Sequence, residues 1–181
     1  VISIFALPLE LPVASFEKLE RYCDPEKGMA QRWEDGQIHP IPQDYADMTG
    51  WKELTGLVVK AYNQLDESEK PYCIVFGENY GLAGAVQFYG HNFQLPQPIS
   101  FADNYLLWAP DQIPEGPVIF INHEVGDLDD LFQSVIEVGK VENPYFRERG
   151  VKVFLCRNRQ SFAGSFYSDK VKMLKSAYCR Q

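Results

Sequence analysis

The spacing of hydrophobic residues along the chain predicts strands and helices in alternation. An unbroken apolar run, typical of a strand buried on both faces, occupies residues 73–76, and mainly apolar runs at 118–122 and 151–156 predict two further buried strands. Apolar residues recur at helical spacing over residues 51–65 and 81–89, which predicts two amphipathic helices. Weaker patterns predict a short helix at 16–22, a strand at 99–102, a short helix at 127–132, a strand at 135–141 and a terminal helical segment at 171–178.

The chain is organised around the strand at 73–76 and the helix that follows it. A turn over residues 77–81, with glycine at both ends, joins the two, and Gly90 is expected to end the helix. A strand that leads into a helix through such a turn is the first half of a βαβ unit, and ligands of such folds commonly bind at the carboxyl ends of the strands. The pattern predicts an α/β fold, a Rossmann- or flavodoxin-like, mainly parallel sheet with helices on both faces in a single domain.

The start of the chain does not follow this alternation. Residues 1–14 are expected to be a connector or the end of a preceding membrane helix, and residues 15–181 the single α/β domain. Residues 1–7 are nearly all apolar and lack the features of a signal peptide, so an edge strand and a membrane-helix remnant both stay open. Residues 24–47 are polar and without period, and loops of that length are usually functional or held by partners.

Composition narrows the classes of partner. The 181 residues suffice for one well-buried domain, and aromatic residues reach 14%, which indicates a partly aromatic core. A net charge of −8 argues against nucleic acid or an anionic lipid surface as a partner. It favours neutral ligands, cations or another protein.

The turn at 77–81 offers backbone amides at a helix start, but it is neither a GxGxxG motif nor a P-loop. Glu78 would also repel a phosphate. Either the glycines serve the turn and the close packing of helix on sheet, or Glu78 and Asn79 hold a neutral polyol or sugar. Tyr105 and Trp108 could stack on a sugar ring, whereas a place in the aromatic core is the ordinary role of such side chains.

Other candidate chemistry is sparse. The three histidines are dispersed, which favours ordinary loop histidines over a zinc site, and no nucleophile elbow or phosphate-binding loop occurs. Cys73 and Cys156 lie in apolar runs, so buried free thiols are expected, although a reactive Cys156 beside Arg157 is an alternative. Disulfide pairing of the four cysteines is undecided. Neither a cofactor nor a metal is expected.

Several short motifs in series resemble a known family. They are Pro-Gln-Asp-Tyr-Ala-Asp-Met-Thr-Gly-Trp at 42–51, Glu-Asn-Tyr-Gly at 78–81, Ala-Gly-Ala at 83–85, Phe-Tyr-Gly at 88–90, Leu-Pro at 95–96, the aromatic segment at 105–108 and Cys-Arg at 156–157. In order and spacing, from about residue 7 to residue 174, the chain resembles the C-terminal soluble domain of bacterial dolichyl-phosphate-mannose-protein mannosyltransferase-like membrane glycosyltransferases. It departs from the family where Phe-Ala-Asp-Asn at 101–104 replaces a common Gly-His-Asn run, and where the loop after Arg157 lacks prolines.

The resemblance implies a domain that follows a multi-spanning membrane body and lies on the extracytoplasmic, periplasmic side. In that family the membrane body holds the lipid-linked sugar donor and the catalytic acidic residues, so this chain would carry no catalytic residue and would be inactive alone. Its partners would be that membrane body and, as a further candidate, a glycan or acceptor. The apolar start at 1–7 would then be the exit of the last membrane helix.

Residues that could contact a glycan or acceptor fall in three groups along the chain. Carboxylates and amides would exchange hydrogen bonds with hydroxyls, and aromatic faces would pack on sugar C–H surface. The candidates are Asp44, Asp47 and Trp51, then Glu78, Asn79 and Tyr80, then Asn104, Tyr105 and Trp108. The alternatives are a structural domain that packs on the membrane body without a ligand and, less favoured, an independent α/β enzyme or small-molecule-binding protein.

Overall fold

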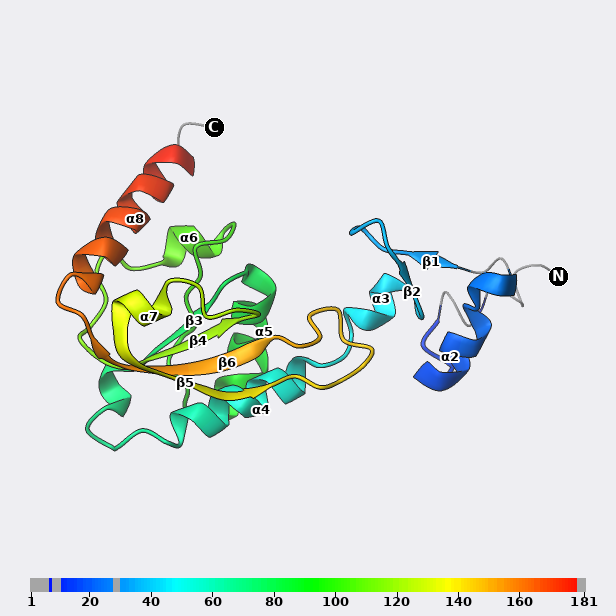
Figure 1. Ribbon diagram of the computed structural model, residues 1–181, viewed down its shortest axis with the longest axis horizontal. Coiled ribbons are helices and arrows are strands. Elements are labelled where there is room, and N and C mark those ends of the chain that lie inside the picture. Colours follow the sequence, from blue (N-terminus) through cyan, green and yellow to red (C-terminus); the bar gives the residue numbers. More distant parts are fainter. Residues whose placement is uncertain (1–6, 8–10, 28–29, 179–181) are drawn as a thin grey trace. The chain divides into compact units, whose positions relative to one another are not determined.

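A computed structural model describes residues 7, 11–27 and 30–178. They fall into two compact units, one formed by the chain up to residue 50 with 142–149, the other by 51–141 with 150–181 (Figure 1). The apolar start at 1–6 and most of the expected connector at 1–14 lie outside the described residues, and a single domain over 15–181 stays a prediction. Within the described part, no helix is both long and apolar enough to cross a membrane.

The larger unit is an α/β fold around a four-stranded mixed sheet. Its strands are β3 (Ile74–Gly77), β4 (Val118–Asn122), β5 (Phe132–Lys140) and β6 (Lys152–Arg159), in the order β3-β4-β6-β5. β3 and β4 are parallel neighbours, with Ile74 opposite Val118 and Phe76 opposite Phe120. A single parallel bridge from Phe76 to Ile99 extends the sheet beyond β3, where the sequence predicted a short strand.

The expectation of a mainly parallel sheet is wrong. β4 pairs antiparallel with β6, and β6 antiparallel with β5, so two of the three pairings between the four strands are antiparallel. A parallel neighbour needs a crossover of a dozen or more residues, usually a helix. Between β4 and β5 the chain forms only the four-residue α7 (Leu128–Leu131), and the connection from β5 to β6, residues 141–151, contains no helix. The α/β class is confirmed, and the sheet is mixed.

Helices lie on both faces of the sheet, as the sequence predicted. α4 (Trp51–Tyr62) and α5 (Tyr80–Gly90) pack together on one face, where α4 contacts β4, β5 and β6 and α5 contacts β3 (Figure 1). α6 (Tyr105–Trp108), α7 and α8 (Ala163–Tyr178) lie on the other side. Alternate residues of β3, β4 and β6 therefore serve two cores, and Phe76, Phe120 and Phe154 belong to the one on the α7 and α8 side.

The helix boundaries show where local sequence signals were incomplete. α5 ends at Gly90, as expected, but Gly90 has a φ of −86°, and the left-handed residue is Gln94, after a 3-10 turn at His91–Phe93. α8 begins at Ala163, eight residues before the expected terminal segment. A Cβ on Gly77 would lie 2.8 Å from the Ala83 nitrogen, so glycine permits the close approach of α5 to the end of β3.

The smaller unit contains structure that the sequence patterns missed. The residues expected to form a long loop include a hairpin, β1 (Gln31–Arg32) with β2 (Ile38–His39), and the short α3 (Gln43–Ala46). These elements share a small core with α2 (Phe16–Tyr22), the expected first helix. Residues 142–149 return to this unit, where the Tyr145 ring stacks on Phe16 with the ring centroids 5.0 Å apart.

Candidate functional site

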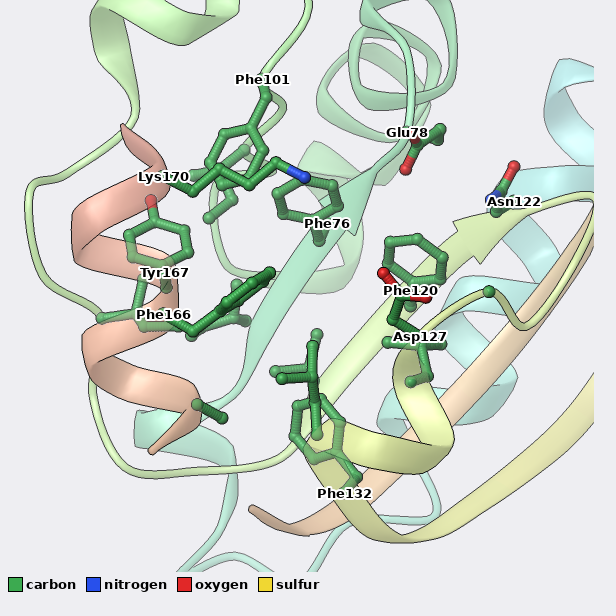
Figure 2. Close-up of a pocket in the computed structure, with 18 of the residues that line it drawn as sticks. Phe76, Glu78, Phe101, Phe120, Asn122, Asp127, Phe132, Phe166, Tyr167 and Lys170 are labelled. Carbon is green, nitrogen blue, oxygen red and sulfur yellow. The ribbon is translucent and has the colours of Figure 1, made fainter. Parts of the chain in front are cut away.

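A cavity of about 510 Å³ opens in the larger unit between the sheet and helix α8 (Figure 2). Its floor is the face of β3 and β4 opposite α4 and α5, and α7 and α8 form its sides. Pockets of this size accommodate small organic ligands. We call it the aromatic pocket, after its lining residues Phe76, Phe101, Phe120, Phe132, Phe166 and Tyr167.

The floor of the aromatic pocket changes character along the two parallel strands. Because side chains alternate in a strand, every second residue faces the pocket: Ile74, Phe76 and Glu78 from β3 and the turn after it, and Val118, Phe120 and Asn122 from β4. Because the two strands are paired in register, residues of similar character lie side by side. Ile74 lies beside Val118, Phe76 beside Phe120, and the Glu78 carboxylate beside the Asn122 amide. The pocket therefore has an apolar end, an aromatic middle and a polar end.

The aromatic middle is a continuous series of rings. Phe76 and Phe120 lie with centroids 5.5 Å apart and planes 21° apart, and Figure 2 shows them side by side on the floor. Phe101 meets Phe76 edge-on at 4.9 Å, and Tyr167 of α8 lies 5.4 Å from Phe101. The Tyr167 hydroxyl donates to the Pro110 carbonyl oxygen at 2.9 Å, and burial raises the pKa of Tyr167 to about 12. Its hydroxyl is thus engaged outside the series, and the ring serves as apolar surface.

The polar end carries three side chains that the protein leaves available for a ligand. Glu78 and Asp127 are exposed, and among the described residues neither forms an ion pair. Asp127 precedes α7, but its carboxylate caps no backbone amide. The Asn122 Oδ1 accepts from the His123 amide at 2.8 Å, and no acceptor for its NH₂ group is found among the described residues. Figure 2 shows all three on the side of the pocket where Phe120 lies.

Cations reach the aromatic pocket from the opposite side. Five lining residues of α8 share one helix face, and Lys170 is the charged one, with its Nζ 5.8 Å from the Phe166 ring centroid. Arg159 of β6 also lines the pocket, but its guanidinium donates to the Pro114 carbonyl oxygen at 3.1 Å and lies 3.7 Å from Glu115. Carboxylates therefore mark one end of the pocket, and Lys170 marks the helix wall.

Local structure explains why Glu78 stands at the pocket. Its backbone amide donates to the Ile121 carbonyl oxygen at 3.1 Å, which continues the pairing of β3 with β4 by one residue. Asn79 then ends the strand, and its side-chain oxygen accepts from the Leu82 amide at 2.9 Å as the N-cap of α5. Asn79 was predicted as a ligand contact, but that oxygen is engaged in the cap. Glu78 alone of the nine candidates lines the aromatic pocket.

The candidates around α6 form a separate group. The Tyr105 hydroxyl donates to Gln87 Oε1 at 2.5 Å, and burial raises the pKa of Tyr105. Trp108 lies edge-on to Tyr105 with ring centroids 5.3 Å apart and remains 64% exposed. Asn104 Oδ1 accepts from the Tyr178 hydroxyl at 3.2 Å. Tyr80, at the start of α5, is exposed. None of these four side chains lines the aromatic pocket.

Asp44 and Asp47 belong to the smaller unit, whereas Trp51 begins α4 of the larger unit. Asp44 is exposed on the first turn of α3. The Arg147 guanidinium lies 3.3 Å from the Asp47 carboxylate and 3.1 Å from the Glu34 carboxylate. The Asp47 carboxylate therefore takes part in an ion-pair network within that unit. The Trp51 indole lies beside Gly81 at the start of α5. Asp47 and Trp51 thus have local partners within their own units, whereas Asp44 is exposed.

The cysteines support the simpler of the two interpretations. Cys73 and Cys156 are free and buried, and burial raises the pKa of each thiol to about 12. Arg157 does not activate Cys156, because its guanidinium donates to the Glu69 carboxylate at 3.1 Å. Within the described residues, no group of three or more histidine, cysteine, aspartate or glutamate side chains is placed to hold a metal ion.

The strongest site residues were missed by the sequence motifs. Phe120, Asn122, Asp127 and Lys170 were not among the nine candidates, because these four residues lie outside the segments 42–51, 78–81 and 101–108 from which the candidates came. A signal was present: both parallel strands carry a phenylalanine and then, two residues later, a polar residue, at matching distances from their ends. Lys170 could not be found this way, since it comes from a helix whose position depends on tertiary packing.

The fold and the geometry of the pocket can be compared with known proteins. No model of a protein family matches the chain, and no curated protein or solved structure is similar to it.

Proposed function

We propose that this chain is an accessory extracytoplasmic domain of a membrane glycosyltransferase with a lipid-linked sugar donor, and that it contacts a glycan or acceptor through the aromatic pocket. The membrane location and the transferase rest on the motif resemblance at 42–51, 78–90 and 156–157. The observed mixed sheet bears out the α/β class of the expected fold. Its finer description, a Rossmann- or flavodoxin-like arrangement, is part of this proposal.

The observation that carries the binding role is the polar end of the aromatic pocket. Phe120 offers ring surface on which the C–H face of a sugar can pack, while Glu78 and Asp127 offer carboxylate oxygens to its hydroxyls. The Asn122 NH₂ group adds a donor. A binding role needs no catalytic group in this chain.

The membrane part of the proposal is tested on the genomic sequence upstream of Val1. A long open reading frame with about ten apolar segments, and an acidic pair in the first loop, would support a transferase body. A start codon at or just before Val1 would remove it.

The binding part is tested in the complete protein by the exposed pair Glu78→Gln and Asp127→Asn. Both substitutions preserve side-chain size, so folding should be unaffected, while the KM for the acceptor should rise several-fold. Asp44→Asn, on the smaller unit, is the matched control and should leave the KM unchanged. An unchanged KM in the pocket variant would contradict the binding role.

A second candidate function is structural, and a specific surface favours it. Exposed apolar side chains gather on and beside α5 and α6, namely Tyr80, Phe88, Phe93, Leu107 and Trp108. Such a surface can pack on a membrane body without any ligand. Phe88→Ser with Trp108→Ser should then reduce transferase activity by detaching the domain, while pocket variants keep full activity.

A further inference from the structure

We infer that the aromatic pocket binds a small amphiphile, with an apolar body along the floor and a non-anionic, hydrogen-bond-donating head at Glu78, Asn122 and Asp127. The inference rests on the proposed function only in placing the ligand in this pocket. It adds the chemical class of the ligand, either a hydroxyl-bearing head such as a glycoside or an ammonium.

The first support is the gradient of polarity along the floor. From Ile74 to Glu78, and from Val118 to Asn122, the lining changes from aliphatic to aromatic to polar in the same order on both strands. Four residues of strand extend over about 13 Å. A free monosaccharide would cover only the polar end and would leave the apolar end wet, whereas a ligand with one polar head and an apolar body matches the whole floor.

The second support is the lining opposite the floor. Along α8, Ala163, Phe166 and Leu174 line the pocket on the helix face that also carries Tyr167. Leu131 and Phe132, at the end of α7 and the start of β5, add apolar surface near the aliphatic end of the floor. The apolar body of the ligand is therefore enclosed on several sides, where burial of hydrocarbon contributes most to affinity.

The sign of charge at the polar end disfavours an anionic head. Two carboxylates lie there beside one amide, and neither carboxylate forms an ion pair within the part of the chain that the structure describes. All three side chains can accept a hydrogen bond, and Asn122 can also donate one. A phosphate or carboxylate head would meet like charges, while hydroxyls or an ammonium would meet acceptors. Lys170 lies on the helix wall, with its Nζ near the Phe166 ring. Substitution of Lys170 tests whether its ammonium group binds an anionic head instead.

The experiment is calorimetric titration of the 181-residue chain with four probes that share a hexyl chain. The heads are β-glucoside, ammonium, phosphate and a methyl-capped triethylene glycol, which accepts hydrogen bonds but donates none. Butyl and methyl β-glucosides complete the series. We expect binding of the glucoside and ammonium probes, with affinity rising about three- to four-fold per added methylene, and phosphate binding at least tenfold weaker.

Substitutions locate the two ends of the ligand. Glu78→Gln with Asp127→Asn should weaken the ammonium probe about tenfold and the glucoside several-fold, since charged acceptors are lost. Phe166→Ser should reduce the gain per methylene. The matched control is Phe88→Ser, an exposed phenylalanine outside the pocket, which should change neither quantity.

Several results would overturn the inference. Equal affinity of methyl and hexyl glucosides would contradict the claim that the ligand has an apolar body, but would be compatible with the proposed glycan contact. If the capped glycol binds as tightly as the glucoside, the claim that the head must donate hydrogen bonds is wrong. If the phosphate probe binds most tightly of the four, and its binding is lost in Lys170→Met, the preferred head group is anionic and the inference is wrong. If none of the hexyl probes binds, the inference is wrong. If methyl β-glucoside also fails to bind, the proposed glycan contact is contradicted as well.

Discussion

Gly77→Ala should destabilise the larger unit, because this residue sets the distance between the end of β3 and the start of α5. A Cβ at position 77 would lie 2.8 Å from the backbone nitrogen of Ala83 and 3.2 Å from its Cα. Ordinary contacts begin at 3.4 Å, so the first turn of α5 would have to withdraw by about 0.6 Å. The atoms in the way are backbone, and no side-chain rotation relieves them.

The expected magnitude is about 1–2 kcal/mol of lost unfolding free energy. Overpacking of this kind costs roughly 1–3 kcal/mol, and the reduced freedom of the unfolded chain returns about 0.4–1 kcal/mol. Gly56→Ala is the matched control. Gly56 lies inside α4 and is exposed, and a Cβ there meets nothing within 4 Å, so alanine should stabilise by about 0.5–1 kcal/mol.

Urea denaturation followed by far-ultraviolet circular dichroism measures both variants. With a slope of about 2 kcal/mol per molar urea, the Gly77→Ala midpoint should fall by roughly 0.5–1 M while that of Gly56→Ala rises. Because Glu78 follows directly, hexyl glucoside should also bind the Gly77→Ala variant more weakly. A Gly77→Ala midpoint equal to that of the parent chain would refute the claim that glycine is needed for the approach of α5.

Two further predictions concern groups whose environments are well defined. Asn79→Ala removes the 2.9 Å cap bond to the Leu82 amide and should cost about 1 kcal/mol in the same urea assay, whereas Asn79→Asp should restore most of it. Cys73 and Cys156, with pKa values raised to about 12 by burial, should react with an aromatic disulfide only on unfolding. Because their ionisation begins near pH 9 in the unfolded chain, their stabilising contribution is complete below that pH and declines as pH rises toward 12. The stability advantage of the parent chain over the double alanine variant should therefore shrink between pH 9 and 11.

The elements that were predictable from the sequence are those whose burial is strongly periodic. The strands at 74–77 and 118–122 and the helices at 51–62 and 80–90 lie where their patterns indicated, because each buries one clear face or run. The β1–β2 hairpin was missed, since two strands of two residues each are too short to show a period. Strand direction was wrong because an apolar run has the same appearance in parallel and antiparallel neighbours, and only the connections distinguish them.

The candidate site was predictable at one residue for a related reason. Glu78 was found because a polar residue at the end of a buried strand is a local feature of the sequence. Asp127 and Lys170 come from a loop and a helix that reach the same cavity only through tertiary packing. Asn79 shows the opposite error, since a polar residue at the same turn was needed to cap a helix.

Antiparallel pairing of β6 with β4 also explains why the pocket has a polar end at all. In a fully parallel sheet the crossover helices would cover both faces along their length. Here the chain after β4 turns through α7 and enters β5 directly, so this side of the sheet is covered by the short α6 and α7 and by α8, which comes after the last strand. The face of β3 and β4 is consequently left partly open, and Glu78 and Asn122, at the carboxyl ends of the two strands, border a cavity instead of a packed helix. The departure from the expected topology and the candidate site thus have one cause, the absence of a crossover helix after β4.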